Sequence, residues 1–305
     1  MYDVIIIGSG PAGLTAAIYT SRARLRTLVI GGITWGGQLM LTSEVENFPG
    51  FPDGILGSDL MTRMRKQAEK FNAKFLFEDV TSADFSSHPF RINVHEKSFE
   101  AKAVIIATGA LYKWLGLDAE RRLTGRGVSF CATCDAPFFR DKKVIVVGGG
   151  DTAMDEALTL AKYAKEVIIV HRRDKLRASK ILQERVFTDI KIKIMWNNLV
   201  EDILGMDRVK GVKLKNVQTG KSITFPCDGV FIAIGLKPNT EMFKGQLNLD
   251  ENGYIIVYEG TKTNVEGVFA AGDNQDAKYK QAITSAGEGC KAALDAERYL
   301  QEHPS

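Results

Sequence analysis

Short unbroken runs of apolar residues recur along the chain, and each is followed by a turn rich in glycine. The first run, Val4-Ile5-Ile6-Ile7, leads directly into Gly8-Ser9-Gly10-Pro11-Ala12-Gly13. Unbroken β-branched runs are typical of parallel strands that are covered on both faces. The helix formers of residues 14–19 and the apolar run 27–30 then complete a predicted strand-helix-strand unit.

The same pattern returns in the middle of the chain. Apolar residues 144–147 precede Gly148-Gly149-Gly150-Asp151-Thr152-Ala153, a predicted helix over residues 154–163 and a second strand over 167–170. Glycines in such a loop permit a tight turn and let a pyrophosphate approach the backbone at the helix N-terminus. The repeat therefore predicts an α/β fold with two Rossmann-like, three-layer domains, which bind two dinucleotides.

Two further predicted strands also end in glycine. Residues 104–106 run into Ala107-Thr108-Gly109, and residues 268–271 run into Gly272-Asp273. Each alone fits an ordinary buried strand, but together with the loop at Gly8 they form a set of signals for a nucleotide site. The Asp273 carboxylate suits a polyol hydroxyl of a flavin. The strand over 27–30 ends in Gly31-Gly32, where a ribose-binding acid is usual and none is present.

The second repeat carries a different signal at the end of its second strand. His171, Arg172 and Arg173 follow that strand, and Arg177 comes four residues after Arg173. Guanidinium groups bind a phosphate through paired hydrogen bonds, so this site is expected to take NADPH. The alternative is a basic turn exposed to solvent.

Two cysteines, Cys131 and Cys134, are separated by two residues, and Asp135 follows at once. Two thiols at this spacing close a small disulfide or share a proton, which makes one of them reactive. The adjacent carboxyl is placed to supply a proton to a departing thiolate. Half of a zinc site is the alternative, but the other cysteines, Cys227 and Cys290, are single and far away, and we interpret them as buried small hydrophobic residues.

Composition narrows the class of protein. The chain has 305 residues, enough for two domains, with 45% hydrophobic and 25% charged residues and a net charge of +3. The charge is diffuse, which argues against a nucleic-acid partner, and the chain shows neither a signal peptide nor an apolar run of about 20 residues for a membrane. With four cysteines, only two of them close together, the chain does not fit a secreted disulfide scaffold, and we expect a cytoplasmic protein.

Over nearly its whole length the chain resembles a known family. It is similar to the low-molecular-weight, bacterial and archaeal type of thioredoxin reductase, among the pyridine nucleotide-disulfide oxidoreductases. The motifs that carry the resemblance, in order, are GSGPAG at 8–13, GGQL at 36–39, EVENFPGFP at 44–52, ATGA at 107–110, CATCD at 131–135, GGGDTA at 148–153, HRRDKLRA at 171–178, AAGD at 270–273 and QAITSAGEG at 281–289.

The resemblance implies a domain plan and a chemical path. The FAD-binding domain would comprise residues 1–112 and 245–305, and the inserted NADPH-binding domain, residues 113–244, would carry the dithiol. NADPH would reduce FAD, and FAD would reduce the Cys131–Cys134 disulfide. The resulting dithiol would then reduce thioredoxin or a similar small redox protein. The resemblance also implies a homodimer, and two domain orientations with hinges near Lys113-Trp114 and Lys244-Gly245.

The resemblance also assigns roles to single residues. By similarity, Cys134 faces the flavin, Cys131 attacks the substrate and Asp135 protonates the dithiol, although Asp135 before Ala136-Pro137 also suits a helix cap. The FAD positions are Gly8, Gly10, Pro11, Ala12, Gly13, Gly31, Gly32, Gly37, Gln38, Asn47, Val80, Ala107, Thr108, Gly109, Gly272, Asp273, Gln281 and Ala282. The NADPH positions are Gly148, Gly150, Asp151, Thr152, Ala153, His171, Arg172, Arg173 and Arg177.

Several alternatives stay open at this level. The electrons could pass to a glutaredoxin-like protein or a peroxidase, and a chain of this fold could also be a ferredoxin or flavodoxin reductase, a dithiol oxidase or a non-catalytic flavin-binding regulatory module. The intact CATCD motif favours a dithiol enzyme, and the three arginines favour NADPH. The segment Gly31, Gly32 and Thr34 departs from the family because it lacks a carboxylate for the adenosine ribose.

Overall fold

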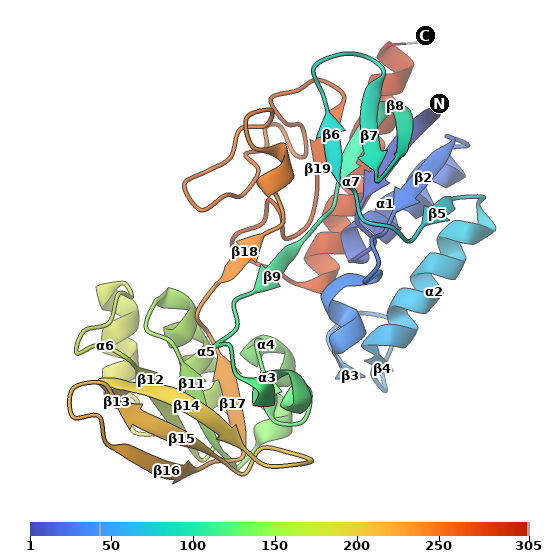
Figure 1. Cartoon of the computed structure of the whole chain (residues 1–305). Coiled ribbons are helices and arrows are strands. Elements are labelled where there is room, and N and C mark those ends of the chain that lie inside the picture. Colours follow the sequence, from blue (N-terminus) through green and yellow to red (C-terminus); the bar gives the residue numbers. More distant parts are fainter. Residues whose placement is uncertain (43, 304–305) are drawn as a thin grey trace. The chain divides into compact units, whose positions relative to one another are not determined.

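The computed structural model describes residues 1–42 and 44–303, and the chain divides into two compact units. Unit 1 comprises Met1–Leu111 and Lys237–Ser305, and unit 2 comprises Tyr112–Leu236. The chain passes between them along β9 (Ala110–Tyr112) and β18 (Leu236–Pro238), which pair as a two-stranded sheet (Figure 1). Unit 2 is therefore an insertion in unit 1.

The second boundary differs from the expected one. The contacts place it between residues 236 and 237, whereas the sequence suggested 244 and 245. The side chain of Phe243 is fully buried in unit 1, and its ring stacks on that of Phe85 with centroids 5.9 Å apart. Because this apolar contact fixes the segment that contains Phe243, the eight residues before 245 belong to unit 1. The first boundary, between residues 111 and 112, lies one residue before the expected position.

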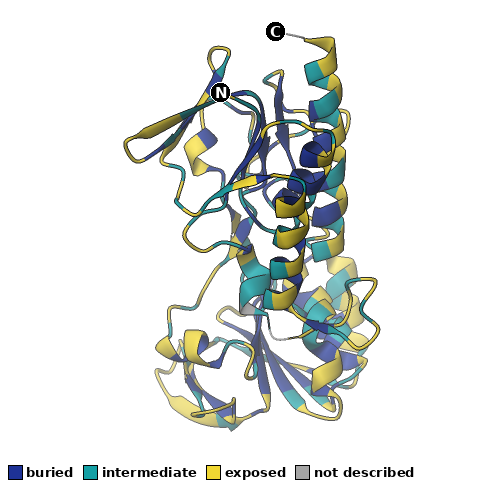
Figure 2. Cartoon of the chain, turned by 90° about the vertical axis from the view of Figure 1, so that its right-hand side faces the viewer, coloured by how far each residue is buried: buried dark blue, intermediate teal, exposed yellow. Residues whose placement is uncertain are grey.

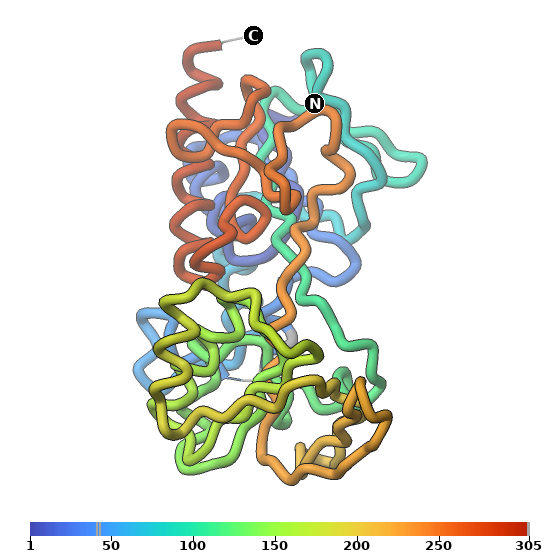
Figure 3. Tube along the Cα trace, turned by 90° about the vertical axis from the view of Figure 1, so that its left-hand side faces the viewer, coloured from blue at the N-terminus to red at the C-terminus, as the bar shows by residue number. Residues whose placement is uncertain are grey.

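Unit 1 alternates strands and helices in its first half, and its C-terminal segment adds a further strand and helix to the same layers. Besides β9 and β18, its elements are β1 (Tyr2–Ile7), α1 (Pro11–Arg22), β2 (Thr27–Ile30), η1 (Gly37–Leu41), β3 (Glu44–Val45), β4 (Ile55–Leu56), α2 (Gly57–Lys70), β5 (Lys74–Leu76), β6 (Ser82–Asp84), β7 (Phe90–Val94), β8 (Lys97–Ile106), η3 (Glu241–Phe243), β19 (Val268–Ala270) and α7 (Ala282–Glu302). Figure 3 traces the red C-terminal helix beside the blue N-terminal segment.

The main sheet of unit 1 has the order β5-β2-β1-β8-β7-β6, and β19 pairs with β8. Strands β5, β2, β1, β8 and β19 run parallel, so their carboxyl ends share one edge. Alternate residues of β1 enter different cores: Val4 and Ile6 pack with residues of α1 and α7, and Ile5 and Ile7 pack with Phe90 and its neighbours. This burial on both faces explains why the run contains no polar residue.

Unit 2 contains the second repeat. Its elements are α3 (Asp118–Leu123), β10 (Val128–Ser129), α4 (Ala132–Asp135), η2 (Ala136–Phe139), β11 (Lys143–Val147), α5 (Asp151–Ala161), β12 (Glu166–His171), α6 (Lys180–Thr188), β13 (Ile192–Trp196), β14 (Asn198–Leu204), β15 (Gly211–Asn216), β16 (Ser222–Pro226) and β17 (Gly229–Ile232).

Unit 2 has three layers. A parallel sheet of order β10-β17-β11-β12-β13 lies between helices and a second, antiparallel sheet of order β14-β15-β16. Val144 and Val146 pack with residues of α5, whereas Ile145 and Val147 pack with residues of β14 and β15. Figure 2 shows the buried residues concentrated along these strands.

The predicted strand-helix-strand units are confirmed in both halves. The strand over 27–30 has the expected bounds, while α5 begins at Asp151 rather than at residue 154 because Gly150 acts as its N-cap. Within the described residues even α7, the longest helix at 21 residues, has no apolar stretch long enough to cross a bilayer.

Candidate active site

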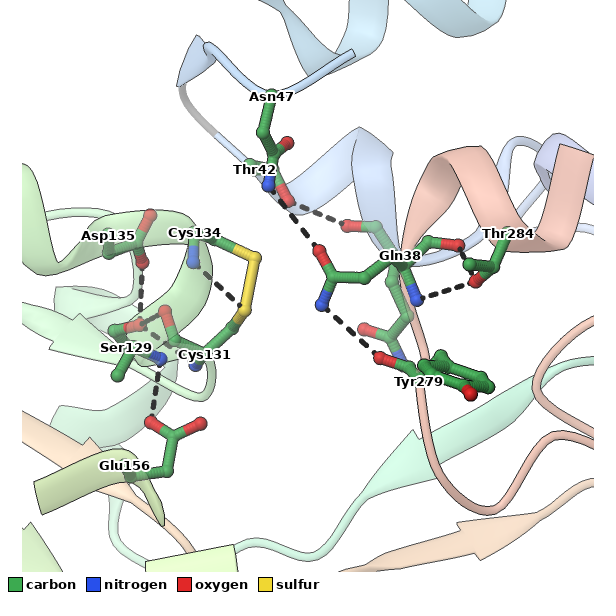
Figure 4. Close-up of a disulfide and its surroundings, with 12 residues drawn as sticks. Gln38, Thr42, Asn47, Ser129, Cys131, Cys134, Asp135, Glu156, Tyr279 and Thr284 are labelled. Atoms are coloured by element: carbon green, nitrogen blue, oxygen red, sulfur yellow. Dashed lines mark hydrogen bonds between the residues drawn. A yellow bond between two sulfur atoms is a disulfide. The ribbon is translucent and has the colours of Figure 1, made fainter. Parts of the chain in front are cut away.

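The two cysteines of the CATCD motif form a disulfide at the surface of unit 2. Cys131 caps the short helix α4 and Cys134 lies within it, with their Cα atoms 5.3 Å apart. The Cys131 sulfur also accepts a hydrogen bond of 3.2 Å from the backbone N–H of Cys134 (Figure 4). An N–H donated to a sulfur stabilises that sulfur as a thiolate, so this contact favours the thiolate form of Cys131 once the disulfide is reduced.

Asp135 belongs to the same loop, and its carboxyl is held by Ser129 rather than by the following turn. The Ser129 hydroxyl donates a hydrogen bond of 2.5 Å to Asp135 Oδ2 and accepts the N–H of Cys131 at 3.1 Å. Burial raises the pKa of Asp135, and the bond from Ser129 opposes that rise. The side chain makes no capping hydrogen bond to η2, so the alternative role as a helix cap is not seen.

A second acid, Glu156, approaches the motif from α5. Its Oε2 accepts the backbone N–H of Ala132 at 2.6 Å. Burial raises the pKa of Glu156 to about 8 against the opposing effect of the Ala132 amide, and the charges of Asp135 and Asp155 raise it further. No local signal in the sequence marks this residue, because Ala132 and Glu156 stand 24 residues apart and are brought together only when α4 packs against α5.

The glycine loop of unit 2 is shaped to leave the start of α5 open. A Cβ on Gly148 would overlap the backbone oxygen of Ala233 and the side chain of Ala153, so close packing requires glycine there. A Cβ on Gly150 would meet nothing within 4 Å, and no side chain caps the helix at this residue. The first N–H groups of α5 are therefore free to bind an anion such as a pyrophosphate.

The arginines of unit 2 lie near that loop. Arg172, Arg173 and Arg177 are exposed, and the backbone N–H of Arg177 donates to the oxygen of Gly149 at 2.7 Å. His171 is buried: its ring lies beside Gly149, Nε2 lies 2.9 Å from the oxygen of Lys175, and burial lowers its pKa. His171 thus supports the loop, whereas the arginines present their charges to solvent.

The remaining NADPH-type positions either hold the glycine loop and α5 in place or lie at the surface. Asp151 Oδ1 accepts the backbone N–H of Ser179 at 2.6 Å, which ties the start of α5 to the segment after the arginines. Thr152 is exposed, and Ala153 is fully buried beneath Gly148.

The glycine loop of unit 1 repeats this construction. A Cβ on Gly8 would overlap the backbone oxygen of Ala107, and one on Gly13 would overlap the oxygen of Gly8. Gly10 opens to space at the N-cap of α1, where Pro11 is the first helical residue and no side chain caps the helix. A second anion site of the same kind results.

Ser9 links this loop to the segment after β2. Its hydroxyl donates to the oxygen of Gly31 at 2.9 Å and accepts the N–H of Gly36 at 2.9 Å. A Cβ on Gly37 would lie 3.5 Å from the Cα of Gly10, so the two loops are neighbours.

The structure places a carboxylate at the end of β2, where the sequence has none. Asp79, which follows β5, accepts the backbone N–H of Ile33 through Oδ1 at 3.1 Å and is exposed. The same oxygen would lie 2.9 Å from a Cβ on Gly32, so glycine leaves room for it. Because β5 is the parallel neighbour of β2, its carboxyl end delivers the acid that β2 lacks.

The other FAD-type positions also lie in unit 1, at the carboxyl ends of parallel strands or in segments around them. Asp273 accepts the Ser285 hydroxyl at 3.0 Å, and burial raises its pKa to about 6. Three further side chains donate hydrogen bonds: Gln38 Nε2 to Ala110 O at 3.0 Å, Asn47 Nδ2 to Gln281 Oε1 at 3.4 Å and Thr108 Oγ1 to Asn239 O at 2.7 Å. Val80 packs against the strands, and Gly272 closely approaches Ala12. Gly109 forms an open left-handed turn, and Ala282 begins α7.

Known proteins share this arrangement. The family model for pyridine nucleotide-disulphide oxidoreductases matches residues 2–289. The thioredoxin reductase of Streptomyces clavuligerus is 54% identical, with 98% of this chain and 94% of that protein covered. The chain belongs to the thioredoxin reductases of the pyridine nucleotide-disulphide oxidoreductase family. The thioredoxin reductase of Rickettsia bellii is 52% identical, with 98% of each chain covered, and the crystal structure of that from Streptococcus pyogenes superposes with a TM-score of 0.94 at 42% identity and 99% coverage of both chains.

This family of oxidoreductases uses FAD and NADPH, and the geometry of each unit fits a dinucleotide. Each unit has a glycine loop whose packed glycines admit no side chain and whose open glycine precedes an uncapped helix. The N–H groups at the start of each helix, which no side chain caps, suit a pyrophosphate. The chain therefore has the two nucleotide sites that a flavin-dependent thioredoxin reductase needs.

The other cysteines stand apart from this chemistry. Cys227 is buried, as predicted, and this burial raises the pKa of its thiol to about 12, so the thiol is unreactive near neutral pH. Cys290 on α7 is only half-buried, and in this respect the prediction of a buried residue is wrong.

Proposed function

We propose that the chain is an NADPH-dependent reductase of thioredoxin or a similar small redox protein, with the Cys131–Cys134 disulfide as its redox centre. One observation carries this proposal: the two cysteines are joined in a disulfide, and the carboxyl of Asp135 is held in the same loop by Ser129. Bound FAD and NADPH supply the pair of electrons that opens the disulfide.

In this proposal the two sulfurs have different tasks. Once the disulfide opens, the amide of Cys134 supports a thiolate on Cys131, which attacks the disulfide of the protein substrate. Cys134 then attacks the mixed disulfide at Cys131, and the reduced substrate leaves. The resemblance to the family supports the same order.

Asp135 is proposed as the acid of the exchange. Its raised pKa keeps a proton available closer to neutral pH than an exposed aspartate would, and it directly follows Cys134 in the chain. The hydroxyl of Ser129 holds the carboxyl in place and limits the rise in pKa.

The nucleotide preferences are also proposals. Arg172, Arg173 and Arg177 supply the charge for the 2′-phosphate of NADPH at the loop of unit 2. In unit 1, Asp79 would replace the missing acid and bind the adenosine ribose of FAD, and Asp273 would bind a hydroxyl of the polyol chain.

The test follows NADPH oxidation by the FAD-loaded protein in the presence of oxidised thioredoxin. We expect Cys134→Ser and Cys131→Ser to abolish turnover, because neither variant can form the disulfide. Cys290→Ser, which removes a cysteine outside the CATCD motif, is the matched control and should keep the wild-type rate. Turnover of thioredoxin that survives in Cys134→Ser would disprove the proposed relay.

The choice of partner is tested in the same assay. Oxidised glutaredoxin and a thiol peroxidase replace thioredoxin at equal concentration, and the largest kcat/KM identifies the preferred class.

We also propose a cytoplasmic homodimer, as the resemblance and the small number of cysteines suggest. Light scattering of the purified protein gives its mass in solution, and a monomer would contradict the dimer.

A further inference from the structure

Glu156 is a half-buried acid that the proposed exchange does not use, and it contacts the backbone of the redox loop. The amide that it binds, at 2.6 Å, belongs to Ala132, the residue bonded directly to Cys131. Figure 4 shows the Glu156 carboxyl and the Asp135 carboxyl on different sides of this loop. A carboxyl so close to a group that gains negative charge responds electrostatically to that charge.

The groups around Glu156 leave it without a compensating cation. Asp135 on α4 and Asp155 on its own helix both act on it with negative charge, and η2 brings no titratable side chain. Arg185 on α6 acts on Asp155. In the strands behind α5, Lys143 and Lys193 pair with Glu166. Over the described part of the chain, no ion pair involves Glu156.

We propose that Glu156 is a positioning residue of the dithiol reaction, which holds the amide of Ala132 and binds a proton when the Cys131–Cys134 disulfide is reduced. The inference rests on the proposed function. Reduction breaks the Sγ–Sγ bond and adds two electrons from the bound cofactors. With one proton for Cys134, the products are a thiol at Cys134 and a thiolate at Cys131. The new negative charge at Cys131 favours a second proton on the Glu156 carboxylate.

The direction of this effect follows from linkage. With the disulfide intact, the pKa of Glu156 is about 8, so the carboxyl is largely ionised at higher pH. A thiolate nearby raises that pKa further, and over the interval between the two values reduction takes up one additional proton. One proton per pH unit changes the equilibrium constant of a two-electron couple tenfold, or about 30 mV.

The experiment measures the midpoint potential of the dithiol in the FAD-loaded protein. Wild type and Glu156→Gln are equilibrated in dithiothreitol redox buffers from about pH 6.5 to about pH 10, and the thiols are counted by alkylation and mass spectrometry. The glutamine keeps an oxygen for the Ala132 amide but cannot ionise. We expect the equilibrium constant of the wild type to change more steeply above pH 8, by up to about tenfold more per pH unit than that of the variant.

Two controls and a second measurement keep the inference falsifiable. Glu184→Gln removes an exposed acid of α6 and should match the wild type, while Glu156→Ala also loses the hydrogen bond and should unfold at lower temperature. An equal pH dependence of the equilibrium constant in wild type and Glu156→Gln would overturn the proposal. If Glu156→Gln does not fold, infrared difference spectra of the wild type at alkaline pH, with isotope-labelled glutamate, decide instead. Reduction must produce a protonated glutamate band, and its absence overturns the proposal.

The outcome is separable from the proposed function. A dithiol that NADPH does not reduce in the FAD-loaded protein would contradict the proposed function itself. A dithiol that is reduced normally, with the same pH dependence in wild type and Glu156→Gln, would contradict only the role of Glu156.

Discussion

Removal of the Ser129 hydroxyl tests the proposed acid directly. In Ser129→Ala, Asp135 loses the hydrogen bond that it receives at 2.5 Å. That bond stabilises the ionised carboxylate and holds the pKa of Asp135 down against the effect of burial, so its loss raises this pKa.

The size of the change follows from the type of bond. A hydrogen bond to a charged acceptor contributes about 1.5–3 kcal/mol. At about 1.4 kcal/mol per pKa unit, its loss raises the pKa of Asp135 by roughly 1–2 units. An acid works while it is protonated, so activity falls as the pH rises through its pKa. In Ser129→Ala this alkaline decline of kcat should move to higher pH by the same interval.

The assay is the pH profile of kcat for NADPH-dependent reduction of thioredoxin. Ser129→Thr keeps a hydroxyl and should keep the wild-type profile. Thr133→Ala removes an exposed hydroxyl of α4 and should leave the pH profile unchanged. Because the alanine also leaves the N–H of Cys131 without the Ser129 oxygen, a uniform loss of rate is expected as well. An alkaline limb that stays in place in Ser129→Ala would refute the role of Asp135 as the acid.

The nucleotide sites yield two more predictions. Asp79→Asn should weaken FAD binding by about tenfold, because a charge-assisted hydrogen bond becomes a neutral one, while binding of FMN, which lacks the adenosine, stays the same. Calorimetry on the apoprotein measures both affinities, with Glu78→Gln as the control, and equal losses for FAD and FMN would contradict a ribose contact. Arg173→Ala should raise the KM for NADPH about tenfold and leave the KM for NADH unchanged, and an unaltered ratio in steady-state kinetics would defeat the phosphate assignment.

Much of the fold was predictable because its signals are local. The apolar runs of β1, β2, β11 and β12 and the glycine loops after β1 and β11 are contiguous in sequence, and the structure has the strands where the pattern predicts them. The end of the inserted unit was not predictable from such signals. It depends on the contact of Phe243 with Phe85, two residues that the sequence does not connect.

The candidate site shows the same division. The Cys131–Cys134 pair was found by its spacing, since a disulfide across two intervening residues requires no distant partner. The alternative role of Asp135 as a helix cap was equally consistent with the local sequence. Only the position of Ser129, brought to the carboxyl by the turn after β10, decides against the cap.

By itself, then, the sequence determined the repeated strand-glycine-helix pattern, the reactive dithiol and the basic segment after β12, because each is specified by neighbouring residues. Tertiary structure alone decided which acids serve these motifs. Asp79 reaches the end of β2 because β5 pairs with β2, and Glu156 reaches Ala132 because α5 packs against α4. A carboxylate acts through space over a few ångströms, and only the packing of separate elements brings it within that distance.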